Sequence, residues 1–381
     1  MNKWTRLGIV GVMLVVAVLA LVGAVWWSNG RAQETITPAL ALPTPPVVNV
    51  SELDTLLPPD SIQAIDDPQF EAASQALDMA SEERVIGIEI NGEARAYPLT
   101  ILGSHEIVND VVGGESLAVT WCPLCYSALV FSRQVDDRPL TFGVSGQLLQ
   151  NTLIMFDRET GSLWSQLYGG AIDGELNGRP LAVFPSVLTT WEAWLAQHPE
   201  GQVLSKQLTC DQFECGTYAS NPRGSYAVDP YASYYLSSDE GVVSRQIPRD
   251  DFSASPKERV LGVRLEGAAR AYPFTVLSEQ RVINDEIAGV PVLIWFDPAT
   301  QTGAAYRREV DGRILTFQSD TDDLAYVRDV ESNSRWNGAS GEGENGRYHG
   351  ARLTPLISTP AFEFGWTSYF PESDLYGGAL Q

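Results

Sequence analysis

The chain has 381 residues, of which 44% are apolar and 10% aromatic, so it is long and hydrophobic enough to form a packed globular body. Its 48 acidic side chains outnumber 25 basic ones and give a formal net charge of −23. A surface with this charge repels phosphate backbones and anionic lipid head groups, so nucleic-acid binding is excluded from the expected functions.

The N-terminus predicts a membrane anchor. Residues 7–27 carry no charge, follow Lys3 and Arg6, and end in two tryptophans. This length spans a bilayer, and the basic flank predicts that the N-terminus faces the cytoplasm while the rest of the chain lies outside it. We therefore expect a single-pass anchor in residues 1–30. A cleaved secretory signal is the alternative, and it leads to the same compartment.

The next stretch, residues 31–60, is rich in proline, threonine and alanine. Proline density of this kind favours an extended chain, so we expect a linker between the anchor and the body. Apolar residues at helical spacing then predict a short helix over residues 68–83.

The rest of the chain contains an internal repeat. Residues 83–142 align without a gap on residues 258–317 at an offset of 175, with 23 identical positions among 60. A fainter match at an offset of 172 continues toward the C-terminus and pairs Trp164 with Trp336. We therefore predict that the body consists of two tandem units.

The repeat divides the body into a first unit of residues 61–200, an inter-repeat segment of residues 201–257 and a second unit of residues 258–381. A hairpin is predicted at Asn91-Gly92, the strongest short turn signal, and again at the equivalent place in the second unit. Further short strands are predicted at residues 117–121, 127–133, 140–144 and 153–157, and short helices at residues 98–108 and 190–198. The expected fold class is mainly β with a few short helices (α+β), as two tandem homologous units after an N-terminal membrane helix.

Cysteine and histidine single out one place in the first unit. Cys122 and Cys125 form a C-x-x-C pair, and His105 precedes them. The second unit has aspartate, threonine and glutamine at the three equivalent positions. Residues kept in both units most simply serve the shared fold, whereas three metal-binding or nucleophilic side chains that are lost together indicate one functional cluster. We therefore take His105, Cys122 and Cys125 as the candidate site.

Four motifs carry a resemblance to a known family: residues 105–110 (HEIVND), 120–128 (TWCPLCYSA), 142–146 (FGVSG) and 155–166 (MFDRETGSLWSQ). On these motifs the chain resembles the bacterial domain-of-unknown-function family 3179 (DUF3179). The resemblance implies a protein outside the cytoplasm in which His105 and Cys122 belong to the family pattern, while Cys125 is more variable. It implies no activity, and it gives no role to Cys210 and Cys215. The expected location is the bacterial cell membrane, with the globular part outside the cytoplasm.

The C-x-x-C pair supports three kinds of chemistry. Between two predicted strands it resembles a knuckle that points both sulfurs at one metal ion. Zinc or copper would need more ligands, for which His105 is the third and Met155 or Asp157 the fourth. In thiol redox chemistry, His105 would instead stabilise a thiolate. In an oxidising compartment the pair can also form an inert structural disulfide, which is the expected state of Cys210 and Cys215.

Four polar residues are candidates for a pocket beside the cysteines: Asn151, Asp157, Arg158 and Gln166. All of them lie in or next to the family-like motifs. A buried network between Asp157 and Arg158 would give the same pattern, so the structural alternative stays open.

The expected function is a metal-binding or thiol redox site at His105, Cys122 and Cys125 in a membrane-anchored protein. The expected cofactor is one zinc or copper ion, or none, and the expected partner is an unidentified protein or redox partner of the cell envelope. Whether the protein is an enzyme stays open. The alternative is a noncatalytic envelope binding or scaffold module whose cysteines form only structural disulfides.

Overall fold

The computed structural model describes residues 39–136, 138–206, 226–243, 255 and 257–378. The predicted anchor helix and the predicted disulfide between Cys210 and Cys215 lie outside these residues. In the part that is described, no helix combines the length and the apolar character needed to cross a bilayer. The described chain is mainly β-structure with short helices, which confirms the predicted fold class at that level.

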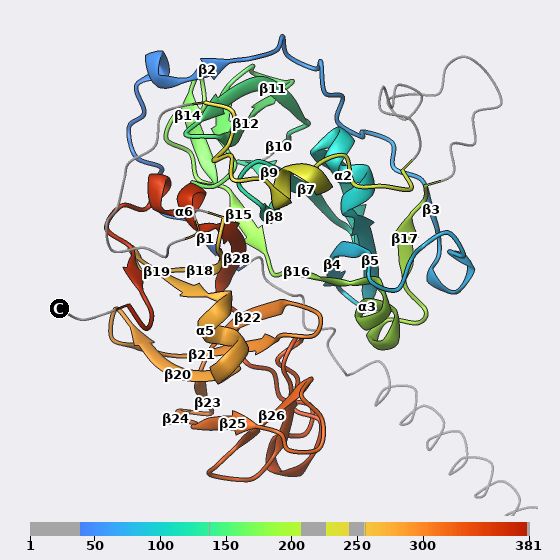
Figure 1. Ribbon diagram of the computed structural model, residues 1–381, viewed down its shortest axis with the longest axis vertical. Coiled ribbons are helices and arrows are strands. Elements are labelled where there is room, and N and C mark those ends of the chain that lie inside the picture. Colours follow the sequence, from blue (N-terminus) through green and yellow to red (C-terminus); the bar gives the residue numbers. More distant parts are fainter. Residues whose placement is uncertain (1–38, 137, 207–225, 244–254, 256, 379–381) are drawn as a thin grey trace, which may run out of the picture. The chain divides into compact units, whose positions relative to one another are not determined.

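The first half of the body contains most of the strands (Figure 1). They are β1 (Ala39–Ala41), β2 (Asp54–Thr55), β3 (Phe70–Ala72), β4 (Arg84–Ile90), β5 (Glu93–Pro98), β6 (Ile107–Val112), β7 (Glu115–Cys122), β8 (Ser127–Ser132), β9 (Gln134–Val135), β10 (Arg138–Pro139), β11 (Phe142–Leu149), β12 (Thr152–Asp157), β13 (Leu163–Ser165), β14 (Gly170–Asp173), β15 (Ala182–Phe184), β16 (Val187–Thr190) and β17 (Gln202–Leu204). The helices are η1 (Val50–Glu52), η2 (Ala73–Gln75), α2 (Leu99–His105) and α3 (Trp191–Gln197). Apart from the β9-β10 hairpin, the strands form three sheets, with orders β16-β4-β5-β17-β3, β1-β15-β8-β7-β6 and β14-β13-β12-β11-β2.

The same succession of elements occurs again in the second half. After α4 (Ala232–Leu236), the elements are β18 (Arg259–Leu265), β19 (Ala268–Pro273), α5 (Phe274–Gln280), β20 (Val282–Ile287), β21 (Val290–Asp297), β22 (Thr302–Arg307), β23 (Glu309–Val310), β24 (Arg313–Ile314), β25 (Phe317–Ser319), β26 (Tyr326–Asp329), β27 (Arg335–Asn337), η4 (Gly346–Tyr348), β28 (Ile357–Phe362), α6 (Glu363–Tyr369) and β29 (Asp374–Leu375). The sheets β28-β18-β19-β29, β20-β21-β22 and β25-β26-β27 reproduce the order of their counterparts. The last strand of each half, β17 or β29, pairs in parallel with β5 or β19.

The two predicted hairpins are present as β4-β5 and β18-β19. Both residues of each two-residue turn have positive φ: 51° and 80° at Asn91 and Gly92, and 54° and 84° at Glu266 and Gly267. This conformation matches the right-handed twist of the flanking strands, and glycine adopts it without a steric cost.

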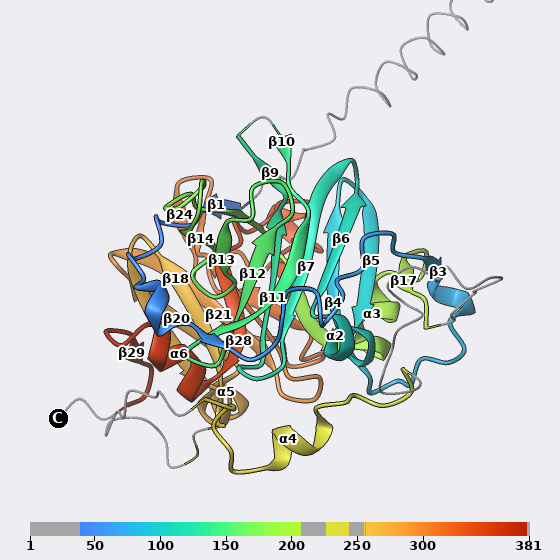
Figure 2. The ribbon, with the colours of Figure 1, turned by 90° about the horizontal axis from the view of Figure 1, so that it is seen from above.

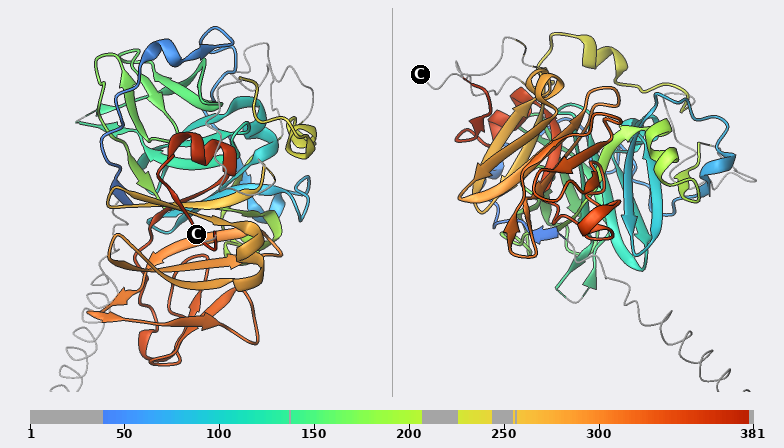
Figure 3. Two further views of the ribbon diagram at one scale, coloured as in Figure 1. Left: turned by 60° about the vertical axis from the view of Figure 1, so that its left-hand side comes forward. Right: turned by 90° about the horizontal axis from the view of Figure 1, so that it is seen from below.

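Each half contributes a strand, β16 or β28, that packs against the other half. In β28, the Thr359 hydroxyl donates to the Ala128 carbonyl oxygen of β8 at 2.9 Å and accepts from the Ala128 N–H at 3.2 Å. In the reciprocal contact, the Thr302 hydroxyl of β22 donates to the Thr189 hydroxyl of β16 at 2.8 Å. Side chains of β28 and α6 complete two hydrophobic cores of the first half. The ribbon of α6, red in Figure 3, lies next to the green strands of that half.

Two predictions differ from the structure. The predicted helix over residues 68–83 is wrong, because Phe70–Ala72 pairs with β17 as an edge strand and only the single turn of η2 follows. The described part of the predicted linker, residues 39–60, contributes strands to the body: β1 pairs with β15 and β2 pairs with β11. Helical spacing and proline content are local signals, and strand pairing with distant residues outweighs them here.

Candidate thiol site

Cys122 and Cys125 lie in the turn between β7 and β8. Cys122 is the last residue of β7, and β8 begins at Ser127. Tyr126 has a φ of 58°, which reverses the chain just before β8. Both cysteines are free thiols, and their exposed fractions are 1% and 0%. The predicted position of the C-x-x-C pair between two strands is therefore correct.

The sulfur of Cys125 lies in a hydrogen-bond network. It is 3.0 Å from the Ser127 hydroxyl oxygen, which accepts from the Cys125 thiol because the single Ser127 proton goes to Gln166 Oε1. The Ser127 hydroxyl also reaches Gln166 Oε1 at 2.8 Å, and Gln166 Nε2 donates to the Thr120 hydroxyl at 3.2 Å. All of these side chains are fully buried. The predicted pocket residue Gln166 therefore contacts the thiol site through Ser127.

The two thiols differ in acidity. Burial raises the pKa of Cys122 well above its ordinary value, and the neighbouring Cys125 sulfur and Glu106 carboxylate raise it further. Burial acts in the same direction on Cys125, but the neighbouring polar side chains of Cys122, Ser127 and Thr152 oppose it, and the pKa of Cys125 is lowered. Within this coupled pair, the surroundings favour a thiolate at Cys125 over one at Cys122.

The second half builds the equivalent turn without sulfur. Thr300 occupies the position of Cys125 and donates from Oγ1 to Asp297 Oδ2 at 2.6 Å. Its Oγ1 is also 2.7 Å from the Thr302 hydroxyl, and Asp297 Oδ1 accepts from the Ala299 N–H at 3.0 Å. Because oxygen side chains close the same turn, the fold does not require cysteines there.

One wall of the thiol site comes from the end of the second half. The Phe362 N–H donates to the Cys125 carbonyl oxygen at 2.8 Å. In α6, a Cβ atom at Gly365 would lie 2.8 Å from the Cβ of Cys125, closer than real Cβ contacts. Glycine therefore lets α6 pack directly on Cys125.

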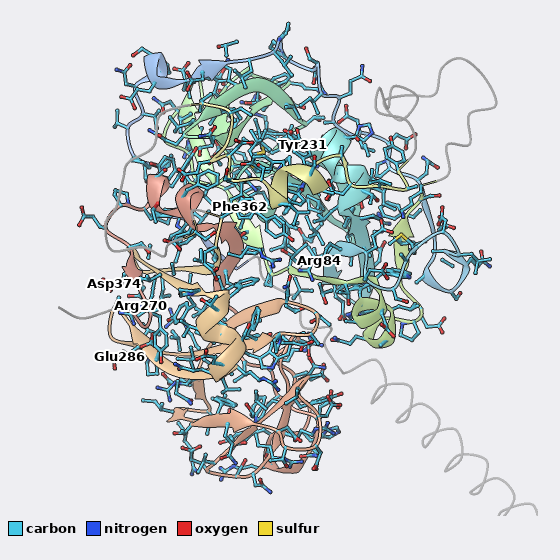
Figure 4. The ribbon with its side chains drawn as sticks, viewed as in Figure 1. Arg84, Tyr231, Arg270, Glu286, Phe362 and Asp374 are labelled. Carbon is cyan, nitrogen blue, oxygen red and sulfur yellow. The ribbon has the colours of Figure 1, made fainter. Side chains whose placement is uncertain are left out.

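A second wall is the cover segment, defined here as residues 226–243, which includes α4. The Tyr234 hydroxyl donates to the Leu124 carbonyl oxygen, between the two cysteines, at 2.8 Å and accepts from the Gly241 N–H at 2.9 Å. In Figure 2, α4 lies on the outside of the body, and Tyr231 and Phe362, labelled in Figure 4, mark the cover segment and the end of β28. The cover segment thus lies over the turn that holds the thiols.

Asn151, a predicted pocket residue, joins the cysteines to the cover segment. Its carbonyl oxygen is 3.9 Å from the Cys122 sulfur. Its side-chain oxygen accepts from the N–H groups of Val242 and Val243 at 2.7 and 2.8 Å, and its side-chain nitrogen donates to the carbonyl oxygens of Val243 and Glu240 at 2.8 and 3.3 Å. Asn151 has a φ of 62°, a conformation that asparagine tolerates better than most residues.

His105 ends α2 and has a hydrogen-bond partner at each ring nitrogen. Nδ1 is 2.7 Å from the Gln63 carbonyl oxygen, so Nδ1 carries the proton and donates. Nε2 is 2.6 Å from the Tyr226 hydroxyl, which therefore donates to it. Burial lowers the pKa of His105, against the opposing effect of the Gln63 carbonyl. The neutral ring thus contacts the start of the cover segment.

The other two predicted pocket residues have contacts elsewhere. Asp157 accepts hydrogen bonds from the Trp164 indole at 2.9 Å and from the Thr160 hydroxyl at 2.8 Å. Arg158 forms ion pairs with Asp60 at 2.5 Å and Asp66 at 3.4 Å. The described contacts of Asp157 and Arg158 therefore belong to the scaffold.

The described residues give limited support to a metal ligand set. Among them, no three His, Cys, Asp or Glu side chains converge on a common point suited to a metal ion. His105 would have to leave both of its partners to act as the third ligand. The two sulfurs alone fall short of the four ligands of a structural zinc site.

A comparison with protein-family models agrees with the motifs at this site. The model described as "Protein of unknown function (DUF3179)" matches residues 59–373. The chain belongs to this family. The match confirms the resemblance and includes both halves of this DUF3179 protein. No curated protein and no solved structure matches the chain.

Several residues around the thiols of this DUF3179 protein were not predicted from the sequence. They are Glu106, Ser127 and Thr152, which affect the two sulfurs, and Tyr226 and Tyr234 in the cover segment. Glu106 and Ser127 lie inside the motifs that carry the family resemblance, so the motif positions contained a usable signal. Tyr226 and Tyr234 are distant in sequence, and only the fold brings them to the site.

Proposed function

We propose that this DUF3179 protein is a thiol–disulfide redox protein whose reacting groups are Cys122 and Cys125. The observation that carries the proposal is the pair of free thiols two residues apart, in a turn that the second half closes with Asp297 and Thr300 instead. A pair kept only to close the turn would not need sulfur, because oxygen side chains close it in the second half.

The chemistry follows from the order of deprotonation. The Cys125 thiolate attacks one sulfur of a partner disulfide, forms a mixed disulfide and releases the partner's other sulfur as a thiolate. Cys122 then loses its proton and attacks the Cys125 sulfur; the Glu106 carboxylate, whose charge acts on the Cys122 thiol, is the candidate proton acceptor. This forms the Cys122–Cys125 disulfide and releases the second partner thiolate. Two protein thiols are oxidised and one partner disulfide is reduced, with two electrons transferred.

We further infer a location outside the cytoplasm and a scaffold role for the second half. The N-terminal apolar stretch would anchor the protein in the bacterial cell membrane and place the thiols outside the cytoplasm. There the partner would be a disulfide-bearing or dithiol protein of the cell envelope. The matching element order and offset support two homologous halves, of which the second has lost the thiols and serves as scaffold.

The test is a redox titration of the full-length chain in mild detergent. The protein is equilibrated in thiol buffers of defined potential, quenched in acid, denatured and alkylated, and each cysteine is assigned by peptide mass spectrometry. We expect a reversible Cys122–Cys125 disulfide with a potential between about −270 and −120 mV, the range of catalytic dithiols. A potential below about −300 mV would instead identify a structural disulfide.

Two control variants complete the titration. Cys122→Ser should trap a mixed disulfide at Cys125, because the resolving thiol is missing, whereas Cys125→Ser should trap much less. Elemental analysis of the same preparation measures bound metal and so tests the predicted metal binding directly. Near-stoichiometric zinc or copper that is lost in Cys122→Ser would favour the metal-binding function over the redox function. Inert thiols at every potential would favour the noncatalytic module.

A further inference from the structure

We propose that the cover segment, residues 226–243, opens to admit a partner to Cys122 and Cys125, and that Asn151 is the residue that holds it closed. This inference rests on the proposed thiol function and concerns the regulation of that same site. Its starting point is a conflict in the structure: thiol exchange requires contact between sulfurs, but the exposed fractions of the two cysteines are 1% and 0%. One wall of the site must therefore move.

The walls differ in how deeply they are buried. Strands β7 and β8 lie in the centre of a sheet, and most of their side chains are buried. Every residue of α6 is buried as well. In contrast, α4 of the cover segment contains no buried residue. Segments with few buried side chains open at the lowest free energy, so the cover segment is the wall that opens first.

Apolar side chains of the cover segment point to the same conclusion. Val228, Leu236 and Val242 have exposed fractions of 69%, 90% and 57%. Tyr235 packs on Tyr126 at 5.2 Å between ring centroids but is only partly buried. The hydrophobic attachment of this segment is therefore confined to three tyrosines, Tyr226, Tyr234 and Tyr235, which pack on one core of the first half.

Hydrogen bonds supply the specific attachment. Asn151 makes four of them to the backbone of residues 240–243, and Tyr234 makes one to the turn between the cysteines. At the start of the segment, the Tyr226 hydroxyl donates to His105. Three positions in or near the family motifs, His105, Leu124 and Asn151, thus contact the cover segment.

Gly241 gives an independent sign that the segment is shaped to receive Asn151. Its φ is 79°, and a Cβ atom there would lie 2.1 Å from Asn151 Cγ and 2.2 Å from Asn151 Oδ1. Any side chain at this position would therefore displace the Asn151 carboxamide. The contact between Asn151 and the cover segment depends on glycine at position 241.

The experiment measures how fast the reduced thiols react with iodoacetamide in the native full-length chain in mild detergent, with Cys122 and Cys125 resolved by peptide mass spectrometry. Asn151→Gly keeps the positive φ and removes the four side-chain hydrogen bonds. Gly241→Ala disrupts the same contact from the other side. Each variant should raise the alkylation rate about 10- to 100-fold, as expected when several hydrogen bonds of one closed state are lost. The double variant should react no faster than the faster single variant, because both remove one contact.

A matched control lies within the cover segment. Asp239→Ala removes the hydrogen bond that the Asp239 carboxylate accepts from the Ser237 hydroxyl inside the segment, and no hydrogen bond to the rest of the body. Its alkylation rate should stay within about twofold of wild type. The rates should also depend only weakly on low concentrations of urea, because local opening exposes little surface.

Two results would contradict the proposal that the cover segment opens. One is alkylation whose urea dependence equals that of global unfolding, which would mean that the thiols react only in the unfolded chain. The other is an unchanged rate in both Asn151→Gly and Gly241→Ala. Alkylation of the reduced protein does not require a disulfide. The proposed opening of the cover segment can therefore be contradicted while the redox titration supports the thiol function, and the reverse also holds.

Discussion

Replacing Asp157 by alanine should destabilise the protein about as much as the equivalent replacement of Asp329. The two carboxylates are fully buried and have matching partners. Asp157 accepts from the Trp164 indole at 2.9 Å and from the Thr160 N–H and hydroxyl at 2.6 and 2.8 Å. Asp329 accepts from the Trp336 indole at 3.0 Å and from a serine N–H and hydroxyl at 2.6 and 2.8 Å.

The magnitude follows from the donors that each variant leaves without an acceptor. The indole N–H is fully buried in both halves, and an unpaired buried donor costs about 1–3 kcal/mol. Thr160 and Ser332, the second donor residue in each half, are partly exposed, so water can replace part of the hydrogen bonding that they lose. We therefore expect Asp157→Ala and Asp329→Ala each to lower the free energy of unfolding by about 2–4 kcal/mol.

The assay is urea unfolding followed by tryptophan fluorescence, together with the thiol redox titration of each variant. If Asp157 is scaffold, its variant should retain the Cys122–Cys125 potential of wild type, as should Asp329→Ala. A shift of the Cys122–Cys125 potential by more than about 30 mV in Asp157→Ala alone, equivalent to about 1.4 kcal/mol, would refute this reasoning. It would show that Asp157 acts on the thiol site.

Three further predictions concern contacts around the thiols. Stability should fall as the pH drops below about 6.5, because burial lowers the pKa of both His105 and His198 and the unfolded chain then binds protons that the folded chain does not; His105→Gln should reduce the slope of this part of a urea-unfolding pH series. Gly365→Ala should lower the free energy of unfolding by about 1–3 kcal/mol, since the added methyl group overlaps Cys125, and unchanged stability in thermal and urea unfolding would contradict that packing. Arg84→Met should cost about 1–3 kcal/mol, because Arg84 donates to backbone carbonyls of both halves, including that of Thr300; a loss below about 0.5 kcal/mol would show that these bonds add little.

The sequence by itself determined the local elements. Alternating apolar residues and the Asn91-Gly92 turn predicted the β4-β5 hairpin, and the repeat located its counterpart. The spacing around Cys122 and Cys125 placed the pair in a turn between strands. These features depend on residues close in the chain, whose backbone preferences and periodicity are visible without the rest of the fold.

Only the tertiary structure decided what surrounds the thiols. Gly365 packs on Cys125 from 240 positions away, and Asn151 binds a cover segment whose sequence carries no regular pattern. His105 was expected beside the cysteines, but its ring contacts Gln63 and Tyr226. In place of the helix predicted over residues 68–83, residues 70–72 form an edge strand for the same reason, because pairing with β17 outweighs helical spacing. Such contacts join residues far apart in the chain, and their free energy depends on the packing of the whole body, which local periodicity does not record.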